Sequence, residues 1–580
     1  MPKKVTRKKV SPKVGAAYNK APNEWTLMFF FAGDNQLSPS MISELKAIKD
    51  AGFQLDTAVL AHFDPNEIGA PTRVFNVNQA RKQDATTSRI GDDKDPFVRN
   101  LNEDDVKPDT IDTYAGIASK RIKKGLEEPD TLDVREALTL FLGFCRENHR
   151  AKHYMLFLVG HGMIVGSDAF LPDDHVIVKK NSPFPGDKII ADSDKLSPGE
   201  LPITALSLKQ LEEVVRGFSE QVKEQGDEFE LLALHSCSMS AIEVAYQLKD
   251  TANYMMATEG VSFVGSWPYR QLLKKTFNTV EAAKKKDSDV DVPELMSDLY
   301  FLSLHNGTDF LSAGYSSDLA LCRLRAGEVG ELTEPLKRLV AALKRGLEAG
   351  SRNLKKRERD ERVKDLILLA HWKAQSFWQE NYTDLFDFCL CLSKSCDAND
   401  ELQEAIRDAC DDVTRRIGAL VVHSDHFGSK YQYAHGLSVY FPWSKAVEDE
   451  DNGILKRYEE EYAFTGELGE DSWFSFLEMY FTETQRDTRA KEEGVRNEEQ
   501  RSGFAAAREF AKPFGSLSRV KPSPELSGGG GKPSPEVGAV CSCVSIKNYP
   551  EETQPLEFQG RQKRNVKAFS ISEGALRAFK

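Results

Sequence analysis

The chain has 580 residues, of which 40% are hydrophobic, and it carries a formal net charge of −13 at pH 7. This length and apolar content predict one large folded domain with added helical material and tails. The acidic balance excludes a general nucleic-acid binder, because such proteins present a basic surface to the phosphate backbone. The longest apolar runs have the length of strands, far short of the roughly 20 residues that span a bilayer, so we expect no membrane partner.

The beginning and the cysteines of the chain point to a cytoplasmic location. Residues 1–23 are basic and contain no acidic residue, but they lack the apolar core of a signal peptide, so we predict a disordered basic arm. Nine cysteines are an odd number in so long a chain, which favours free thiols over a disulfide framework.

The first ordered elements are predicted from continuous apolar runs. WTLMFFFA (25–32) and TAVLAHF (57–63) are typical of strands that are buried on both faces of a parallel sheet. A helix is expected between them, with Ser38 as its cap and Pro39 at its first position. Residues 73–77 are expected to form a short edge strand.

A helix over residues 132–149 leads into a second pair of buried strands. HYMLFLVGHG (153–162) ends in His161 between two glycines, and FELLALHSCSM (229–239) ends at Cys237. A helix over 208–218 precedes the second of these strands, and Ser207 and Gln210 have the spacing of a capping box. The long acidic stretch 163–204 is interpreted as a flap or a processing segment.

Later elements are predicted as a helix at 240–248, a strand at 254–258, and the loop GVSFVGSWPY (260–269). The aromatic side chains of this loop either build a substrate pocket or seal the loop to the core. Further strands are expected at 311–324 and 436–441. Amphipathic helices are expected at 328–350, 363–379, 383–394 and 401–420, which form a helical insertion of about 328–420. The folded domain is predicted to span 24–482, and 483–580 to be a flexible charged tail rich in Pro, Gly and Ser.

Cys389, Cys391 and Cys396 lie close together in the sequence, but they fall in an amphipathic helical stretch without a partner CxxC. We therefore predict no metal site there.

The fold class that these elements define is α/β, with a mostly parallel central sheet flanked by helices. Because parallel strands end on the same side of a sheet, His161 and Cys237 are expected to meet at one edge. A thiol beside an imidazole can act as a nucleophile, since the base generates the reactive thiolate. The amino end of the following helix would favour that anion, and the backbone N–H groups of Gly162 and Cys237 would stabilise an oxyanion.

Other residues around Cys237 offer alternatives. Ser236, Ser238 and Ser240 flank the cysteine, but the GxSxG pattern of a serine nucleophile is not present. His235 lies two residues before Cys237 and therefore on the same face of the strand. It would line a pocket or serve as a second base, and we favour pocket lining.

These segments, in this order, resemble the clostripain family of cysteine peptidases, whose caspase-like fold is related to those of caspases, gingipains and legumains. The matching stretches are FFFAGDNQL, YMLFLVGHG, LLALHSCSMSAIEVAYQL, YMMATEGVSFVGSWPY, LSAGYSSDLALCRL, NYTDLFDF and GLSVYFPW. The resemblance implies a cysteine endopeptidase with Cys237 as nucleophile and His161 as general base and acid.

The substrate-binding positions depart from those of relatives that cleave after basic residues. Such relatives carry an acidic residue two before the cysteine, where this chain has His235, and often a second acid two before the loop tryptophan, where it has Gly265. Ser266 and Trp267 follow, and Glu259 remains nearby as a carboxylate that would restore part of a basic preference. We therefore predict that the P1 preference is not the basic one.

The resemblance also implies processing and cofactor features in the segment between His161 and Cys237. Lys179 and Lys180 are candidate cleavage positions. Calcium is the cofactor that the family suggests, with Asp173, Asp174, Asp192 and Asp194 as available ligands, although a solvated acidic loop explains them equally well.

The expected partners are a protein or peptide substrate and a regulatory protein. The alternative functions are a non-catalytic caspase-like scaffold or binding protein and, from another class, an amidase or transpeptidase.

Overall fold

The computed structural model describes the core of the chain in several stretches. The described residues are 22–33, 35, 37–52, 54–63, 73–77, 134–162, 176–178, 188–190, 206–306, 316–348, 354–377, 380–444, 454–466 and 468–483. The predicted domain limits therefore stay predictions, because most of the arm and nearly all of the tail lie outside these residues.

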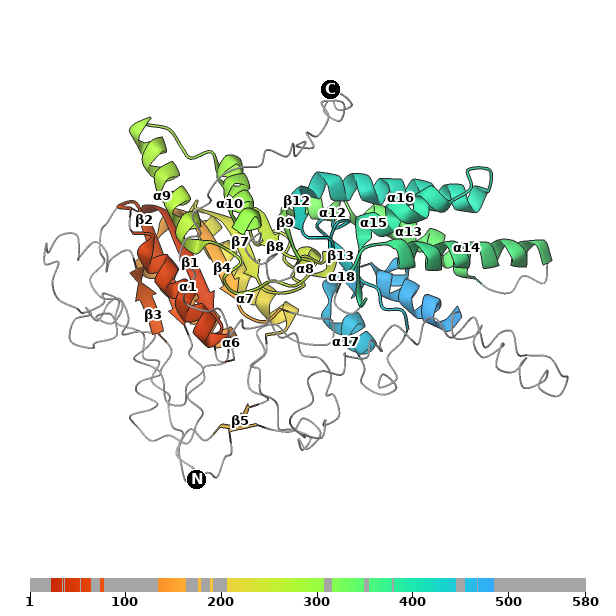
Figure 1. Ribbon diagram of the computed structural model, residues 1–580, viewed down its shortest axis with the longest axis horizontal. Coiled ribbons are helices and arrows are strands. Elements are labelled where there is room, and N and C mark those ends of the chain that lie inside the picture. Colours follow the sequence, from red (N-terminus) through yellow and green to blue (C-terminus); the bar gives the residue numbers. More distant parts are fainter. Residues whose placement is uncertain are drawn as a thin grey trace, which may run out of the picture. The chain divides into compact units, whose positions relative to one another are not determined.

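An eight-stranded sheet forms the centre of the fold, in the order β12-β9-β8-β7-β4-β1-β2-β3 (Figure 1). Neighbours from β8 to β2 run parallel, whereas β3, β9 and β12 are antiparallel to their neighbours. The predicted α/β class with a mostly parallel sheet is confirmed. The strands are β1 (Asn23–Phe31), β2 (Thr57–Phe63), β3 (Arg73–Asn76), β4 (Ala151–Val159), β7 (Glu228–His235), β8 (Tyr254–Ala257), β9 (Ser317–Arg323) and β12 (Val421–Phe427).

The apolar runs form strands because both faces of the sheet are covered. In β1, Met28 and Phe30 pack into one core while Phe29 and Phe31 pack into the other. Phe31 pairs with Phe63 of β2 and with Val159 of β4. The carboxyl ends of the parallel strands therefore lie side by side at one edge of the sheet.

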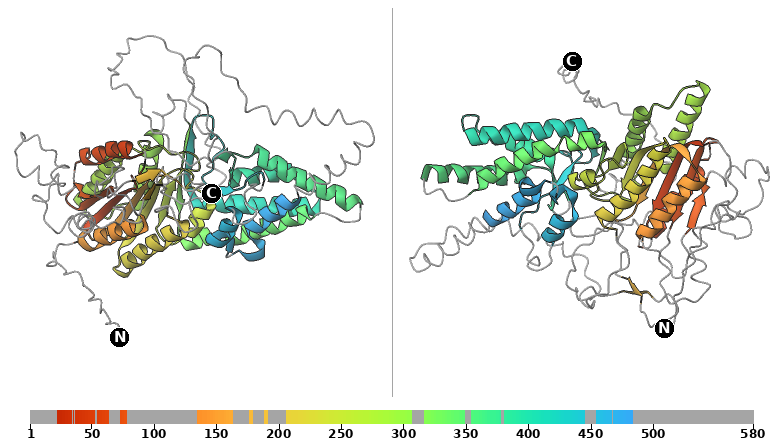
Figure 2. Two further views of the ribbon diagram at one scale, coloured as in Figure 1. Left: turned by 90° about the horizontal axis from the view of Figure 1, so that it is seen from below. Right: turned by 180° about the vertical axis from the view of Figure 1, so that it is seen from behind.

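Helices cover the two faces of the sheet (Figure 2). One face carries α1 (Ser38–Asp50), α9 (Tyr269–Lys285) and α10 (Val292–Asn306), and the other carries α6 (Val134–Asn148) and α7 (Leu208–Glu224). The capping box of α7 is confirmed, because the Ser207 hydroxyl accepts from Gln210 N–H and the Gln210 side chain accepts from Ser207 N–H. Helices α9 and α10 were not predicted from the sequence.

A helical region follows β9 and is built around a small antiparallel sheet, β10-β11-β13. Its helices are α12 (Ala326–Gly330), α13 (Thr333–Leu347), α14 (Leu354–Lys373), α15 (Leu385–Ser395), α16 (Glu401–Leu420), α17 (Ile454–Glu461) and α18 (Ala463–Gly466). Its strands are β10 (Ser376–Phe377), β11 (Tyr382–Asp384) and β13 (Ser438–Tyr440), and the 3-10 turn η2 (Gly469–Asp471) precedes a last helix over residues 473–483. The four predicted amphipathic helices are thus all present; α16 has the predicted ends and the ends of the other three are shifted.

Several details differ from the sequence predictions. Ser38 does not cap α1, because it is already the first helical residue and Leu37 takes the cap position without a side-chain hydrogen bond. The strand expected at 436–441 is present as the shorter β13, in the small sheet. Strand β12 was not predicted, since it is half-buried along most of its length and mixes polar with apolar residues.

Within the segment 163–204, the structure describes two short antiparallel strands, β5 (Val176–Val178) and β6 (Lys188–Ile190). The candidate cleavage positions Lys179 and Lys180 and the candidate calcium ligands Asp173, Asp174, Asp192 and Asp194 lie outside the described residues. Among the helices that are described, none is long and apolar enough to cross a membrane.

Candidate active site

Cys237 lies in a tight turn directly after β7. Ser238, the next residue, has φ 55°, in the left-handed region that non-glycine residues rarely adopt. Two backbone hydrogen bonds hold the turn against the segment after β8: Ser238 N–H donates to Gly260 O (2.9 Å) and Ser240 N–H to Thr258 O (2.8 Å). The segment that directly follows the cysteine is therefore held in place by backbone contacts.

The thiol of Cys237 is buried and contacts the backbone of Ser262. Ser262 N–H donates to Sγ and the thiol donates to Ser262 O, each over 3.4 Å. The expected support from a helix amino end is not found, because α8 (Ile242–Gln247) starts only at Ile242 and has six residues. A helix dipole acts within its first turn, so α8 begins too far along the chain to favour the thiolate, whereas the backbone N–H of Ser262 contacts the sulfur directly.

His161 follows β4, the strand next to β7, and its side chain is 1% exposed. The adjoining Gly162 packs directly on Cys237: a Cβ at residue 162 would lie 1.8 Å from Cys237 O and 2.7 Å from Cys237 N. Only glycine fits there. The glycine therefore serves this close approach to Cys237.

The turn after Cys237 is also bonded to the small second sheet. Ser240 Oγ donates to Gly436 O over 2.7 Å, and Ser438 N–H donates to Ser240 O over 3.1 Å. Ala241 forms a parallel bridge with Ser438 of β13. The helical region thus contacts the turn that bears Cys237 directly, although about 200 positions separate the two in sequence (196 for Ser240 and Gly436).

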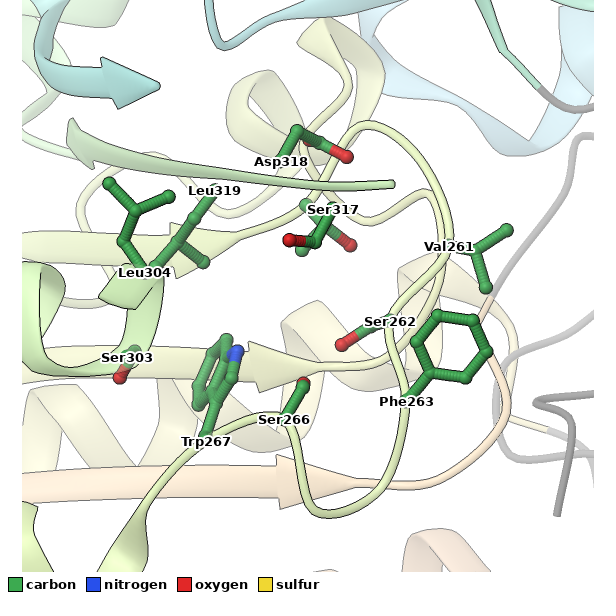
Figure 3. Close-up of a pocket in the computed structure, with 11 residues that line it drawn as sticks. Val261, Ser262, Phe263, Ser266, Trp267, Ser303, Leu304, Ser317, Asp318 and Leu319 are labelled. Atoms are coloured by element: carbon green, nitrogen blue, oxygen red, sulfur yellow. The ribbon is translucent and has the colours of Figure 1, made fainter. Parts of the chain in front are cut away.

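A small cavity of about 20 Å³ lies beside the loop after β8, and Figure 3 shows the residues that line it. Ser262, which contacts Cys237 Sγ, is part of its wall, and so are the predicted substrate-binding residues Ser266 and Trp267. Figure 3 shows the hydroxyls of Ser262 and Ser266 turned toward the space beside Trp267, while Val261 and Phe263 point away from it. The lining is Thr258, Val261, Ser262, Phe263, Ser266, Trp267, Ser303, Leu304, Ser317, Asp318 and Leu319.

His235 lies behind this wall and holds the loop that carries it. Its Nε2–H is shared between Phe263 O (2.8 Å) and Ser266 Oγ (3.1 Å), and its Nδ1 accepts from the Tyr269 hydroxyl (2.6 Å). The ring stacks on Trp267 with centroids 4.4 Å apart. Burial lowers the pKa of His235 to about 4, so the imidazole is neutral at pH 7.

Two further predicted substrate-binding residues do not line the cavity. Gly265 has φ 97°, and its carbonyl accepts from Asn306 Nδ2 over 3.1 Å, so it shapes the loop. Glu259 is fully buried, and its Oε2 accepts from Gly436 N–H over 2.8 Å. Burial and the neighbouring Asp384 raise the pKa of Glu259 well above its usual value.

Asp318 was not singled out from the sequence, yet it fixes the segment on which Cys237 rests. Its two carboxylate oxygens accept from Glu259 N–H (2.6 Å) and Gly260 N–H (3.0 Å). Burial raises the pKa of Asp318 to about 7. The strand-like pattern SDLALCR could have indicated this residue, because Asp318 interrupts a run with both faces buried.

Metal ligands are not gathered in the part of the chain that the structure describes: no group of three or more His, Cys, Asp or Glu there could hold an ion. Cys389 and Cys391 lie on α15 and Cys396 directly follows it, and the three are free thiols.

A mostly parallel α/β sheet with a cysteine and a histidine after adjacent strands, at the carboxyl edge, defines a fold suited to a cysteine peptidase. The sequence model of the Clostripain family, peptidases C11, matches residues 31–480. The chain belongs to the clostripain family of cysteine peptidases. None of the curated proteins compared with it matches.

Solved structures that resemble the chain are also C11 proteases. An inactive zymogen C11 protease from Parabacteroides distasonis is 16% identical with a TM-score of 0.43, and the match covers 78% of this chain and 99% of that one. A secreted C11 cysteine protease from Bacteroides thetaiotaomicron, in complex with an irreversible peptide inhibitor, is 14% identical with a TM-score of 0.42, covering 77% and 99%.

Proposed function

We propose that this cysteine peptidase is an endopeptidase that uses a dyad of Cys237 and His161. The observation that supports the dyad best is the contact of Gly162 with the backbone of Cys237, where a Cβ would lie 1.8 Å from Cys237 O. This contact fixes the histidine turn after β4 against the cysteine turn after β7. Both residue types needed for thiol catalysis therefore lie on adjoining backbone segments.

The proposed reaction has two steps. His161 takes the proton of the Cys237 thiol, and the sulfur attacks the carbonyl carbon of the scissile peptide bond. His161 then gives the proton to the leaving amine, which leaves an acyl group on Cys237. A water molecule, deprotonated by His161, releases the acid product and restores the thiol. Backbone N–H groups of Cys237 and Gly162 are the proposed donors to the oxyanion.

The proposed P1 preference is for a residue other than Arg or Lys. At the position two before Cys237, the neutral His235 replaces a carboxylate, and its ring atoms are engaged by Tyr269, Phe263 and Ser266. Glu259 is directed to Gly436. A cationic side chain beside the thiol therefore meets no carboxylate from these two residues, and an unpaired buried charge is strongly unfavourable.

The burial of the dyad residues favours a second candidate function, a non-catalytic caspase-like scaffold. Cys237 is 0% exposed and His161 is 1% exposed. In this conformation a peptide cannot reach the sulfur, so catalysis requires a covering segment to move. A scaffold would need no such movement.

The two candidates are distinguished by peptide cleavage together with thiol reactivity. The full-length protein is incubated with fluorogenic peptides that vary at P1, in parallel with Cys237→Ala, His161→Ala and the core control Cys145→Ala. We expect both dyad variants to lose activity by at least about 10³-fold. Cys145 is buried in α6, away from the sheet edge, so its variant keeps the activity of the parent.

Cleavage that survives in Cys237→Ala overturns the dyad. No cleavage, together with no alkylation of Cys237 by iodoacetamide in mass spectra of the folded protein, supports the scaffold.

A further inference from the structure

Three buried serine hydroxyls around the cavity are not explained by the fold. Ser262 lies in the loop after β8, Ser303 on α10 and Ser317 at the start of β9, and all three line the cavity. Their Oγ atoms are buried and have no hydrogen-bond partner among the described residues. We call these three side chains the hydroxyl cluster. Buried hydroxyls are normally hydrogen-bonded, so three unpaired ones around one cavity indicate a polar group that occupies it.

The cavity adjoins a residue that contacts the thiol of Cys237. Ser262 contributes its hydroxyl to the wall and its backbone N–H to Cys237 Sγ, over 3.4 Å. A ligand in the cavity is therefore next to the atom that would attack the substrate. At about 20 Å³ the cavity holds one water molecule, which favours a short side chain over a long one.

The described lining presents no charge to the cavity. Asp318 is its one ionisable residue, but its side chain is on the other face of the strand. Leu319 and Leu321 pack into the same core as Trp267 and Cys237, whereas Ala320 and Cys322 pack into the opposite core. Because side chains alternate along a strand, Ser317 shares the face of Leu319 and Asp318 the face of Ala320.

The contacts of Asp318 agree with this placement. Its carboxylate accepts from Glu259 N–H and Gly260 N–H, on the face where the Tyr431 ring packs against Gly260. The carboxylate is therefore used for the backbone of the loop and not for a ligand in the cavity.

We infer that the hydroxyl cluster of Ser262, Ser303 and Ser317 selects substrates with a short, uncharged, hydrogen-bonding P1 side chain, namely Asn, Ser or Thr. This inference rests on the proposed function. A hydroxyl both donates and accepts, so the three can satisfy the amide of Asn or the hydroxyl of Ser or Thr. An apolar side chain of the same shape would leave them unpaired, and enzyme sites built to hydrogen-bond a substrate reject such analogues strongly.

The test compares peptides that are identical except at P1. Thr and Val have the same shape, Asn and Leu nearly so, and Arg and Lys report on a basic preference. We expect kcat/KM to be about 10- to 100-fold higher for Thr than for Val and for Asn than for Leu, with Arg and Lys poorest.

Single variants locate the effect. Ser303→Ala and Ser317→Ala are each expected to reduce the Thr-to-Val and Asn-to-Leu ratios about 5-fold, chiefly by lowering cleavage of the polar member. Ser297→Ala is the matched control, because Ser297 lies on the same helix α10, bonds to Pro293 O and is not in the cavity lining. Its ratios should equal those of the parent.

The outcomes separate the inference from the function on which it rests. Cleavage that depends on Cys237 but shows equal rates for Thr and Val, or a preference for Arg or Lys, overturns the inference and leaves the peptidase intact. Absence of Cys237-dependent cleavage with all six peptides overturns the proposed function, and the inference with it.

Discussion

Ser317 and Asp318 are neighbours at the start of β9, but they belong to two chemically different faces of the sheet edge. On the face of Ser317, the hydroxyls of Ser262, Ser303 and Ser317 have no described partners. On the face of Asp318, the carboxyl cluster of Glu259, Asp318 and Asp384 accepts backbone N–H groups from three segments. The comparison indicates that the carboxyl groups hold loops in place, whereas the uncharged hydroxyls are left for the proposed ligand.

The largest effect is expected at Gly162, which packs on the backbone of Cys237. In Gly162→Ala the new Cβ would overlap Cys237 O and N, so the histidine turn must separate from the cysteine turn. We expect kcat/KM to fall at least about 100-fold and the protein to lose several kcal/mol of stability, of order 3 kcal/mol, in urea denaturation. Unchanged activity would show that this contact does not hold the dyad together.

The matched control for that variant is Gly217→Ala on α7. No atom lies within 4 Å of the position its Cβ would take. Alanine in a helix interior is more favourable than glycine, so the control should gain about 0.5–1 kcal/mol and keep full activity.

A further buried carboxyl group, that of Glu243 on α8, predicts that the stability of the protein depends on pH. Its Oε1 accepts from Tyr440 N–H (2.9 Å) and the Tyr458 hydroxyl (2.7 Å), and burial raises its pKa from 4.5 to about 7. The folded state then binds the proton more tightly than the unfolded state. The protonated Glu243 therefore stabilises the folded state. This contribution to the free energy of unfolding, about 3 kcal/mol, is complete below pH 4.5 and is lost as the pH rises to 7.

Urea denaturation of the parent and of Glu243→Gln between pH 4.5 and 8 measures this contribution. The variant cannot titrate at this position, so its stability should decline less with rising pH than that of the parent. Parallel curves for the two proteins would contradict the assignment.

Asp318→Asn tests the carboxyl cluster at its centre. The amide can accept with one oxygen and places its NH2 against the other backbone N–H, so we expect a loss of about 1–3 kcal/mol. The P1 ratios should stay as in the parent, because this side chain is on the face away from the cavity. A changed preference would place Asp318 in substrate binding.

Asp425→Asn on β12, where the carboxylate is 64% exposed, is the control for this variant and should change the free energy of unfolding by less than about 0.5 kcal/mol.

The smallest stability effect is expected on the hydroxyl face. Ser303→Ala and Ser317→Ala remove buried hydroxyls that lack described partners, so unfolding in urea should shift by no more than about 0.5 kcal/mol, toward greater stability if at all. A loss of more than 1 kcal/mol would mean that these hydroxyls support the fold, and the distinction between the two faces would fail.

The central sheet could be predicted because its strands are continuous apolar runs. The same runs placed His161 and Cys237 at one edge, since parallel strands end together. The helical region could be predicted from amphipathic periodicity. Helices α9 and α10, which follow the aromatic loop and cover one face of the central sheet, were not predicted.

The chemistry of the pocket could not be predicted in the same way. That Ser317 and Asp318 face opposite cores follows from the pairing of β9 with β8, and register between distant segments is not encoded in a local pattern. Ser303 lies on a helix that was not predicted. The role of His235 depends on Tyr269 and Phe263, 34 and 28 positions away, and the composition of the strand does not reveal such partners.

The bonds from Ser240 to Gly436 and Ser438 also limit how far the protein can be shortened. The helical region begins after β9, far from β7 in sequence, yet its residues Gly436 and Ser438 supply an acceptor and a donor to the turn that bears Cys237. Removing that region would expose Ser240 and Ala241 and free the turn. A minimal peptidase cut from this chain must therefore keep the second sheet, and a variant library aimed at the rate of the enzyme can include positions 436–438 as well as the cavity wall.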